Sequence, residues 1–151
     1  MPEPVKVLFV CMGNCVRSQM AEAIARHDAS DVIAPESAGV HPLGFIDNTT
    51  QRVLRERGIS FGGQFSKGLH THTLKTPDLI VNMSGIPGGS LFAGKNFEDW
   101  RIGDPFGEAI ELHRSICDDI EGNVKELAAR LRRSQSKDDA DTGSRTDSKS
   151  P

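Results

Sequence analysis

The sequence predicts an α/β protein, a three-layer sandwich around a sheet of four parallel strands. Two apolar runs, Val5 to Val10 and Leu79 to Met83, have the composition of central strands that are covered on both faces. Strand-like and helix-like segments alternate along the chain, which is the order that a parallel sheet requires. With 151 residues the chain can bury one core. We therefore expect a single folded domain over residues 1–133.

Two helices and an edge strand are predicted between these apolar runs. The segment from Ser18 to His27 is rich in alanine and favours a helix. Val32 to Glu36 is the expected second strand, and Pro35 within it indicates the edge of the sheet. A helix is expected from Asp47 to Arg57, with an aspartate as its N-terminal cap and Gly58 as its stop.

The second half of the chain supplies a short strand and a long helix. Ile86 to Gly94 contains a Pro-Gly-Gly run, which predicts a loop or a broken helix. Asn96 to Trp100 is the expected fourth strand, and Glu108 to Arg133 has the single apolar face of a packed final helix. Residues 134–151 carry no large apolar side chain, so we expect this polar tail to be disordered in isolation.

Composition and charge exclude several classes of protein. The formal net charge is −3, which leaves no basic field for nucleic acid. No apolar run is long enough to cross a bilayer, and the amino terminus lacks the basic and apolar regions of a secretion signal. Three cysteines suit a reducing cytoplasm, and the five histidines show no metal-ligand spacing. We expect a cytoplasmic monomer without metal, cofactor, nucleic-acid partner or membrane contact.

The most informative segment is the loop between the first strand and the first helix. Its residues are Cys11, Met12, Gly13, Asn14, Cys15, Val16, Arg17 and Ser18. Gly13 and Asn14 are able to take positive φ, so successive backbone N–H groups can converge on one point at the start of a helix. Such a loop binds a tetrahedral oxyanion, and the planar fork of Arg17 can grip two of its oxygens.

Cys11 is expected at the floor of this loop, where it can act as a nucleophile. A helix N-terminus and an adjacent cation favour the thiolate at neutral pH. The hydroxyl of Ser18 can donate to the sulfur and steady it as a leaving group. The alternative is a buried structural cysteine beside a surface arginine, but the surrounding pattern favours the anion site. A thiolate, N–H groups and a guanidinium together suit attack on a phosphate or arsenate ester.

The loop and several later segments resemble one family of enzymes. The stretch from Val7 to Glu22 is similar to the signature of the low-molecular-weight protein tyrosine phosphatase superfamily, which also contains thioredoxin-coupled arsenate reductases. The similarity covers residues from about 5 to 131, through Glu36–Gly39, Arg57–Ser60, Asp78–Met83 and Asp104–Phe106. This resemblance implies the strand order 2-1-3-4, with the second strand outermost. It places Cys11 at the carboxyl edge of a central strand, where ligands bind in such sheets.

The resemblance also implies a general acid at the Asp-Pro pair, which is Asp104 and Pro105 here. Gly103 gives the backbone freedom, and the proline keeps Asp104 out of helical geometry. In the implied mechanism Cys11 attacks phosphorus while Asp104 protonates the leaving phenol. Asp104 then activates the water that hydrolyses the cysteinyl-phosphate. An Asp-Pro pair is also an ordinary turn starter, and this alternative stays open.

Residues outside the loop are implied to support it. Ser37 aligns with a family serine that hydrogen-bonds the loop asparagine, here Asn14, although a serine at a strand end is an equal alternative. Gln64 stands where the family often has a supporting histidine. Many members carry a second cysteine directly before the arginine. The extra thiol here is Cys15, one place earlier, so a bridge between Cys11 and Cys15 is left open.

The expected substrate pocket has apolar walls. One wall should come from the segment 41–45 through Leu43 or Phe45, although both residues are also compatible with an ordinary core position. The other wall should be Phe106, which can stack on a phenyl phosphate. The expected partners are therefore a phosphorylated protein or a small aryl phosphate, with inorganic phosphate or another oxyanion as the ligand of the loop.

Three functions are weighed from the sequence. The first is a protein tyrosine phosphatase that acts through a phosphocysteine intermediate. The second is an arsenate reductase that uses an external thiol, because Asn82 to Leu91 lacks the two cysteines of the thioredoxin-coupled type and Cys117 is predicted in the core. The third is a non-catalytic phosphate-binding module, which the intact set Cys11, Arg17 and Asp104 argues against.

Overall fold

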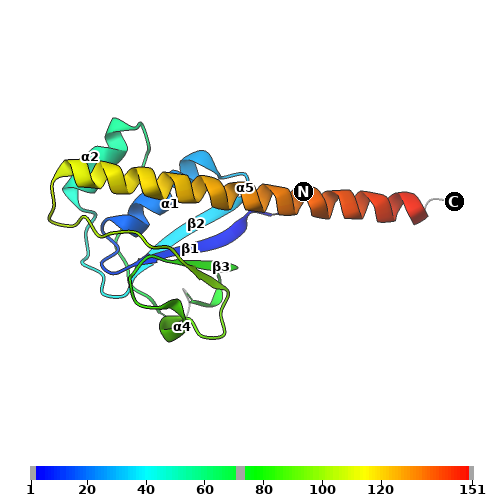
Figure 1. Cartoon of the computed structure of the whole chain (residues 1–151), viewed down its shortest axis with the longest axis horizontal. Coiled ribbons are helices and arrows are strands. Elements are labelled where there is room, and N and C mark those ends of the chain that lie inside the picture. Colours follow the sequence, from blue (N-terminus) through cyan, green and yellow to red (C-terminus); the bar gives the residue numbers. More distant parts are fainter. Residues whose placement is uncertain (1–2, 71–73, 150–151) are drawn as a thin grey trace.

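A parallel sheet forms the centre of the molecule. The computed structural model describes residues 3–70 and 74–149, with side chains through residue 137 of the last helix. The four strands have the order β2-β1-β3-β4 (Figure 1). They are β1 (Val5–Cys11), β2 (Ile33–Gly39), β3 (Leu79–Asn82) and β4 (Phe97–Asp99). The predicted fold class and strand order are confirmed.

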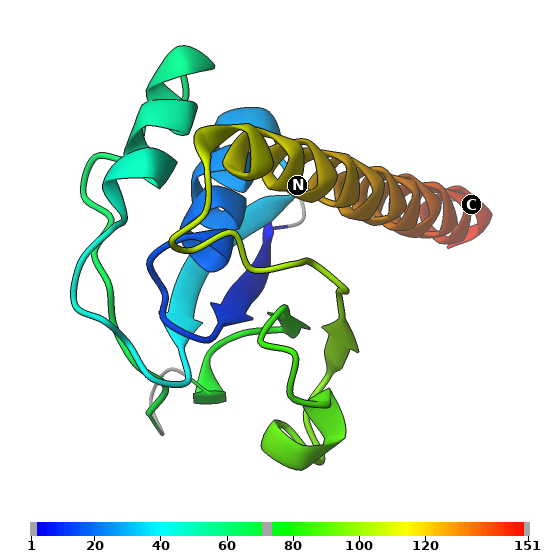
Figure 2. The ribbon, with the colours of Figure 1, turned by 60° about the vertical axis from the view of Figure 1, so that its left-hand side comes forward.

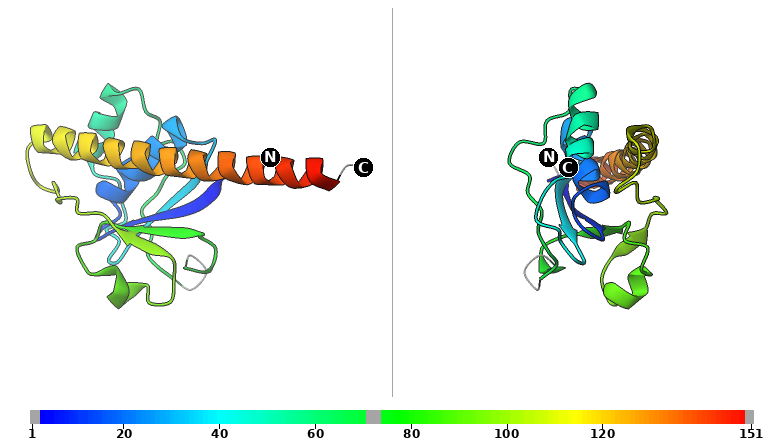
Figure 3. Two further views of the ribbon diagram at one scale, coloured as in Figure 1. Left: turned by 45° about the vertical axis from the view of Figure 1, so that its right-hand side comes forward. Right: turned by 90° about the vertical axis from the view of Figure 1, so that its left-hand side faces the viewer.

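Helices cover the two faces of the sheet unequally. Three of them, α1 (Arg17–Asp28), α2 (Asn48–Glu56) and α5 (Ile110–Lys149), lie on one face, where α5 packs against both α1 and α2 (Figure 2). The short helix α4 (Gly88–Leu91) and its neighbouring loops lie on the opposite side (Figure 3). The Pro-Gly-Gly run predicted as a loop or broken helix thus forms a single short turn of helix.

Both faces of β1 are buried, which explains its uninterrupted apolar sequence. Val7 and Phe9 belong to the large core beneath the helices. Leu8 and Val10 point to the other face, where they join a smaller core that contains Phe92. The burial of β1 on both sides fixes its carboxyl end, and the loop that follows therefore starts from a rigid point.

The second helix begins and ends on local signals. The side chain of Asp47 accepts a hydrogen bond from the backbone N–H of Thr50 at 3.3 Å, which is the N-terminal cap that the sequence predicted. Gly58, just beyond the helix, has a φ of 69°, a conformation that glycine adopts without strain. Pro35 lies in β2, the edge strand that it indicated.

The last helix is longer than the sequence indicated. It does not end at Arg133 but continues to Lys149, and its last turns project beyond the body of the molecule (Figure 1). Residues 134–149 contain no proline, so the local sequence supplies no strong stop. The disorder expected for residues 134–151 in isolation stays a prediction. Within the described part of the chain, no helix combines the length and apolar character that crossing a bilayer requires.

Candidate active site

The loop of residues 11–18 turns its carbonyl groups outward. Backbone N–H groups of the segment 40–47 donate to these carbonyl oxygens at 2.8–3.1 Å; the acceptors are Cys11, Met12, Gly13 and Cys15. The N–H of a trans peptide points opposite to its C=O, so the amide groups that follow face the inside of the loop. The loop is therefore a concavity lined by hydrogen-bond donors at the N-terminus of α1.

The shape of the loop depends on Asn14 and on the end of β2. Asn14 is buried and has a φ of 50°, in the left-handed region that asparagine tolerates better than most residues. Gly39 lies directly against it, because a Cβ at this position would be only 2.8 Å from the Asn14 nitrogen. The loop can therefore adopt this path only beside a glycine.

The sulfur of Cys11 lies on the floor of the concavity beside a hydroxyl. Cys11 Sγ is 2.9 Å from Ser18 Oγ, and both residues are buried. The side-chain amide of Asn14 donates to the same Oγ at 2.7 Å. Because the oxygen already accepts from this amide, its own hydrogen is available to the sulfur. A donor directed at the sulfur stabilises the thiolate over the thiol.

The guanidinium of Arg17 is fixed by the backbone of two distant loops. Its Nη1 donates to the carbonyl oxygens of Met83 at 2.6 Å and Ile102 at 3.1 Å. Its Nε is buried and has no hydrogen-bond partner within the described residues. A buried N–H without a protein acceptor costs free energy unless a ligand satisfies it. Arg17 therefore presents a pre-oriented donor to an oxyanion in the loop.

Asp104 brings a carboxyl group to the same place. Its Oδ2 lies 3.5 Å from Arg17 Nη2, and its Oδ1 accepts a hydrogen bond from the backbone N–H of Phe106 at 3.0 Å. The side chain is about half exposed, at 49%. A carboxyl group held by one backbone bond, yet open to solvent, can exchange protons with both a ligand and water.

Cys11, Arg17 and Asp104 surround one cavity of about 240 Å³. Two exposed apolar side chains form its rim, Leu43 at 48% and Phe106 at 45%. The whole lining consists of Cys11, Met12, Gly13, Cys15, Val16, Arg17, His41, Leu43, Asp104 and Phe106. Sequence reasoning did not single out His41, whose backbone N–H donates to Met12 O.

Two predicted site residues lie away from this cavity. Phe45 lines a neighbouring groove with Phe61 and Phe65, and Gly44, which separates it from Leu43, has a φ of 88°. Ser37 is buried, but its hydroxyl donates to Glu22 Oε1 at 2.6 Å. The family hydrogen bond to the loop asparagine is thus replaced by a bond to a carboxylate on α1.

The two other cysteines have surroundings that favour the neutral thiol. Burial, together with the charges at Cys11 and Asp47, raises the pKa of the Cys15 thiol to about 12. Burial raises the pKa of Cys117 on α5 to about 11, and this residue is a core residue as predicted. All three cysteines are free thiols in the structure. Whether Cys11 and Cys15 form a disulfide on oxidation stays an open alternative.

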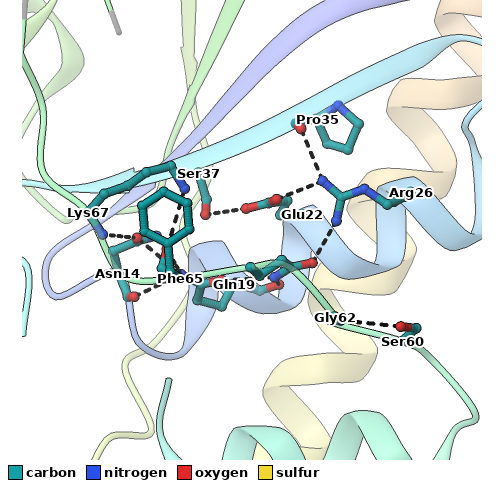
Figure 4. A network of polar contacts seen from close by, with 11 residues as sticks. Asn14, Gln19, Glu22, Arg26, Pro35, Ser37, Ser60, Gly62, Phe65 and Lys67 are labelled. Atoms are coloured by element: carbon teal, nitrogen blue, oxygen red, sulfur yellow. Dashed lines mark hydrogen bonds and ion pairs between the residues drawn. The ribbon is translucent and has the colours of Figure 1, made fainter. Parts of the chain in front are cut away.

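The remaining polar groups form a network behind the loop, of which the sequence indicated only Gln64, at the position of the family's supporting histidine. Gln19, Gln64 and Arg26 connect Asn14 to the surface of α1. Figure 4 shows Asn14, Gln19 and Arg26 in this network. Within residues 3–70 and 74–137, no group of three or more His, Cys, Asp or Glu side chains is placed to hold a metal ion. The chemistry available to the site is thus that of a thiolate, backbone N–H groups, a guanidinium and a carboxyl group.

Comparison with known proteins relates this site to one family. A family model described as low molecular weight phosphotyrosine protein phosphatase matches residues 6–137. A glutaredoxin arsenate reductase from Synechocystis sp. is 32% identical over 135 residues, which are 83% of this chain and 98% of the relative. A protein-arginine-phosphatase from Geobacillus stearothermophilus is 33% identical over 147 residues, 87% of this chain and 99% of the relative.

Solved structures with the same fold include both kinds of protein. The YwlE arginine phosphatase from Geobacillus stearothermophilus has a TM-score of 0.75 at 26% identity, covering 89% of this chain and 97% of that one. An arsenate reductase in a phosphate-binding state superposes with a TM-score of 0.76 at 29% identity, covering 84% of this chain and 98% of that one. The relatives thus include both phosphatases and arsenate reductases, and similarity alone does not choose between these two chemistries.

Proposed function

The chain belongs to the low molecular weight phosphotyrosine protein phosphatase family, and we propose that it hydrolyses aryl phosphate monoesters, phosphotyrosine among them. The observation that carries this proposal is the position of Asp104 in one cavity with Cys11 and Arg17. A proton donor beside the nucleophile serves a departing phenolate, and the apolar rim of Leu43 and Phe106 suits an aromatic ring.

In the first chemical step the thiolate of Cys11 attacks phosphorus and a sulfur–phosphorus bond forms. The bond from phosphorus to the phenolic oxygen breaks, and that oxygen takes a proton from the carboxyl group of Asp104. Inward N–H groups of the loop and the free Nε of Arg17 stabilise the charge on the remaining phosphoryl oxygens.

In the second step water replaces the cysteine. Asp104, now a carboxylate, accepts a proton from water as the water oxygen bonds to phosphorus. The sulfur–phosphorus bond breaks, and Cys11 leaves as a thiolate that receives a hydrogen bond from Ser18. Inorganic phosphate is released and the starting protonation state is restored. Each role uses a side chain that is already within the cavity or directly beneath it.

Arsenate reduction with an external thiol is the second candidate, and the relatives support it. Cys11 would form a bond to arsenic as one arsenic–oxygen bond breaks and its oxygen leaves as water, and an external thiol would then attack the Cys11 sulfur. The electron pair of the sulfur–arsenic bond would pass to arsenic, giving arsenite and a mixed disulfide, which a second external thiol would reduce. The chain's other thiols are buried, so an internal disulfide relay to the surface has no carrier.

Two assays on the same preparation separate these candidates. We expect release of phenol from an aryl phosphate in buffer containing a metal chelator, abolished in Cys11→Ser and strongly reduced in Asp104→Asn. We expect little thiol consumption when arsenate and glutathione replace the aryl phosphate. Arsenate-dependent thiol oxidation that requires Cys11, without aryl phosphate hydrolysis, would overturn the proposal in favour of reduction. Tight phosphate binding with neither turnover would leave only a binding module.

A further inference from the structure

The side-chain amide of Asn14 is held in one orientation by two N–H groups that donate to its oxygen. The backbone N–H of Lys67 donates to Asn14 Oδ1 at 2.8 Å. The side-chain amide of Gln19 donates to the same Oδ1 and to the Asn14 carbonyl, both at 3.1 Å. Two donors on the oxygen leave the Asn14 nitrogen to face Ser18, where it donates at 2.7 Å. The orientation of this one amide therefore decides where the Ser18 hydrogen points.

Gln19 is itself oriented by its neighbours. It is fully buried on α1, and its nitrogen also donates to the backbone carbonyl of Phe65 at 3.0 Å. Its Oε1 accepts a hydrogen bond from the side-chain nitrogen of Gln64 at 2.8 Å, and that nitrogen also donates to the Gln19 carbonyl at 3.2 Å. A reversed Gln19 amide would set its oxygen against carbonyl oxygens, which is unfavourable.

Arg26 is the outermost member of this series of hydrogen bonds and lies at the surface. A guanidinium can only donate, and Arg26 Nη1 donates to Gln64 Oε1 at 2.8 Å. Its Nη2 pairs with the buried carboxylate of Glu22 at 2.7 Å, which holds the guanidinium in place. The oxygen of Gln64 must therefore face Arg26 and its nitrogen must face Gln19. We name Gln19, Gln64 and Arg26 the amide relay; Gln19 and Arg26 are labelled in Figure 4.

We propose that the amide relay positions the Asn14 amide, and through it the Ser18 hydroxyl, so that its hydrogen is directed at the Cys11 sulfur. Arg26 only donates, and each group between it and the sulfur, namely Gln64, Gln19, Asn14 and Ser18, accepts on the side remote from the sulfur and donates on the side towards it. Hydrogen bonds aligned in this way polarise one another, so each strengthens the next. Gln19, Gln64 and Arg26 are positioning residues, because none of them touches the sulfur.

This inference rests on Cys11 as the nucleophile, which both candidate activities require. Its test needs no substrate, so failure of the phosphatase assay leaves it standing. The charged and titratable groups that share the cavity with Cys11 are Arg17, Cys15, His41 and Asp104. None of them is changed in the test variants, and Gln64→Met changes no charge, so a shift in thiolate formation in that variant reports the amide relay.

The test compares two glutamines that each accept from an arginine and donate to a backbone carbonyl. Gln64 accepts from Arg26 and donates towards the loop, whereas Gln51 on α2 accepts from Arg55 at 3.3 Å and donates to a backbone carbonyl at 2.8 Å. Gln51→Met removes this pair of bonds, Gln64→Met removes the equivalent pair and the bond to Gln19 Oε1, and neither variant adds charge. Only Gln64→Met interrupts the amide relay, so Gln51→Met is its matched control.

The measurement is the rate at which iodoacetamide alkylates Cys11 as a function of pH, with peptide mapping to identify the modified thiol. We expect Gln64→Met to slow alkylation at neutral pH about threefold and to move the midpoint of thiolate formation to higher pH. Arg26→Met should act in the same direction, while Gln51→Met leaves the profile unchanged. Thermal melting checks that all variants fold. Equal profiles for Gln64→Met and Gln51→Met, or wild-type profiles for both Gln64→Met and Arg26→Met, would overturn the proposal.

Discussion

Replacing Gly39 by alanine tests whether the anion loop depends on a close approach from the end of β2. Gly39 pairs in register with Cys11 across the sheet. A Cβ at position 39 would lie 2.8 Å from Asn14 N, 2.9 Å from Asn14 Cβ and 2.9 Å from Met12 O. Two of these atoms belong to the backbone of the loop, so no flexible side chain can move aside. The alanine is expected to push the loop away from β2.

The geometry sets the size of the effect. Each of the three contacts is about half an ångström shorter than an ordinary van der Waals contact. A displacement of about 1 Å in a catalytic group costs roughly a hundredfold in rate, so half of that should cost at least about tenfold. Overpacking of a buried site also costs about 1–3 kcal/mol of folding free energy. Gly39→Ala should therefore lower kcat/KM about 10- to 100-fold and reduce stability measurably.

The assay is aryl phosphate hydrolysis, accompanied by urea denaturation and by thermal stabilisation with inorganic phosphate. Gly122→Ala is the matched control, because Gly122 lies in α5 and a Cβ there meets no atom within 4 Å. Alanine in a helix interior should leave activity unchanged and stabilise the fold by up to about 1 kcal/mol. A Gly39→Ala variant with wild-type kcat/KM and undiminished phosphate stabilisation would refute the argument that this glycine shapes the loop.

Three further predictions concern single groups in and around the site. Asp104→Asn should lower kcat for phenyl phosphate about 10²- to 10⁴-fold and the rate for nitrophenyl phosphate less, because a better leaving group needs less protonation; an equal loss across leaving groups would contradict the role of acid. Iodoacetamide at neutral pH should label Cys11 alone, because Cys15 and Cys117 stay protonated until the pH nears their pKa values of about 12 and 11. Peptide mapping identifies the labelled cysteine, and label on Cys15 or Cys117 would contradict this prediction. Asp47→Ala should remove the cap of α2 and lower the free energy of unfolding in urea by about 1 kcal/mol; an unchanged stability would contradict the capping role. The same variant should lower the pKa of Cys15, because it deletes a nearby negative charge.

Features that depend on residues close together in the sequence were predictable from it. The apolar run of β1 indicated a strand buried on both faces, and Val7 and Leu8 do lie in separate cores. Pro35 indicated an edge strand, which β2 is. Asp47 indicated the start of a helix, and its side chain makes the capping bond. In each case the physical signal, whether hydrophobicity, a missing N–H or a capping oxygen, lies within the element itself.

Contacts between distant segments were not predictable in this way. Ser37 was expected to support Asn14, but its hydroxyl donates to Glu22 on α1. Leu43 lies on the rim of the cavity whereas Phe45 lines another groove, although only Gly44 separates the two residues in the sequence. Spacing along the chain does not specify which of several polar partners a side chain will meet.

The sequence by itself determined where the anion loop lies and which groups it contains, because Cys11, Asn14, Arg17 and Ser18 all fall in one short segment between a strand and a helix. Only the tertiary structure decided how the loop is braced. The carbonyl groups that hold Arg17 lie 66 and 85 residues further along the chain, and Gln64 reaches Gln19 across a separation of 45 residues. Such bonds exist because strands and helices pack in one arrangement, and packing depends on all the buried surfaces together rather than on any one segment.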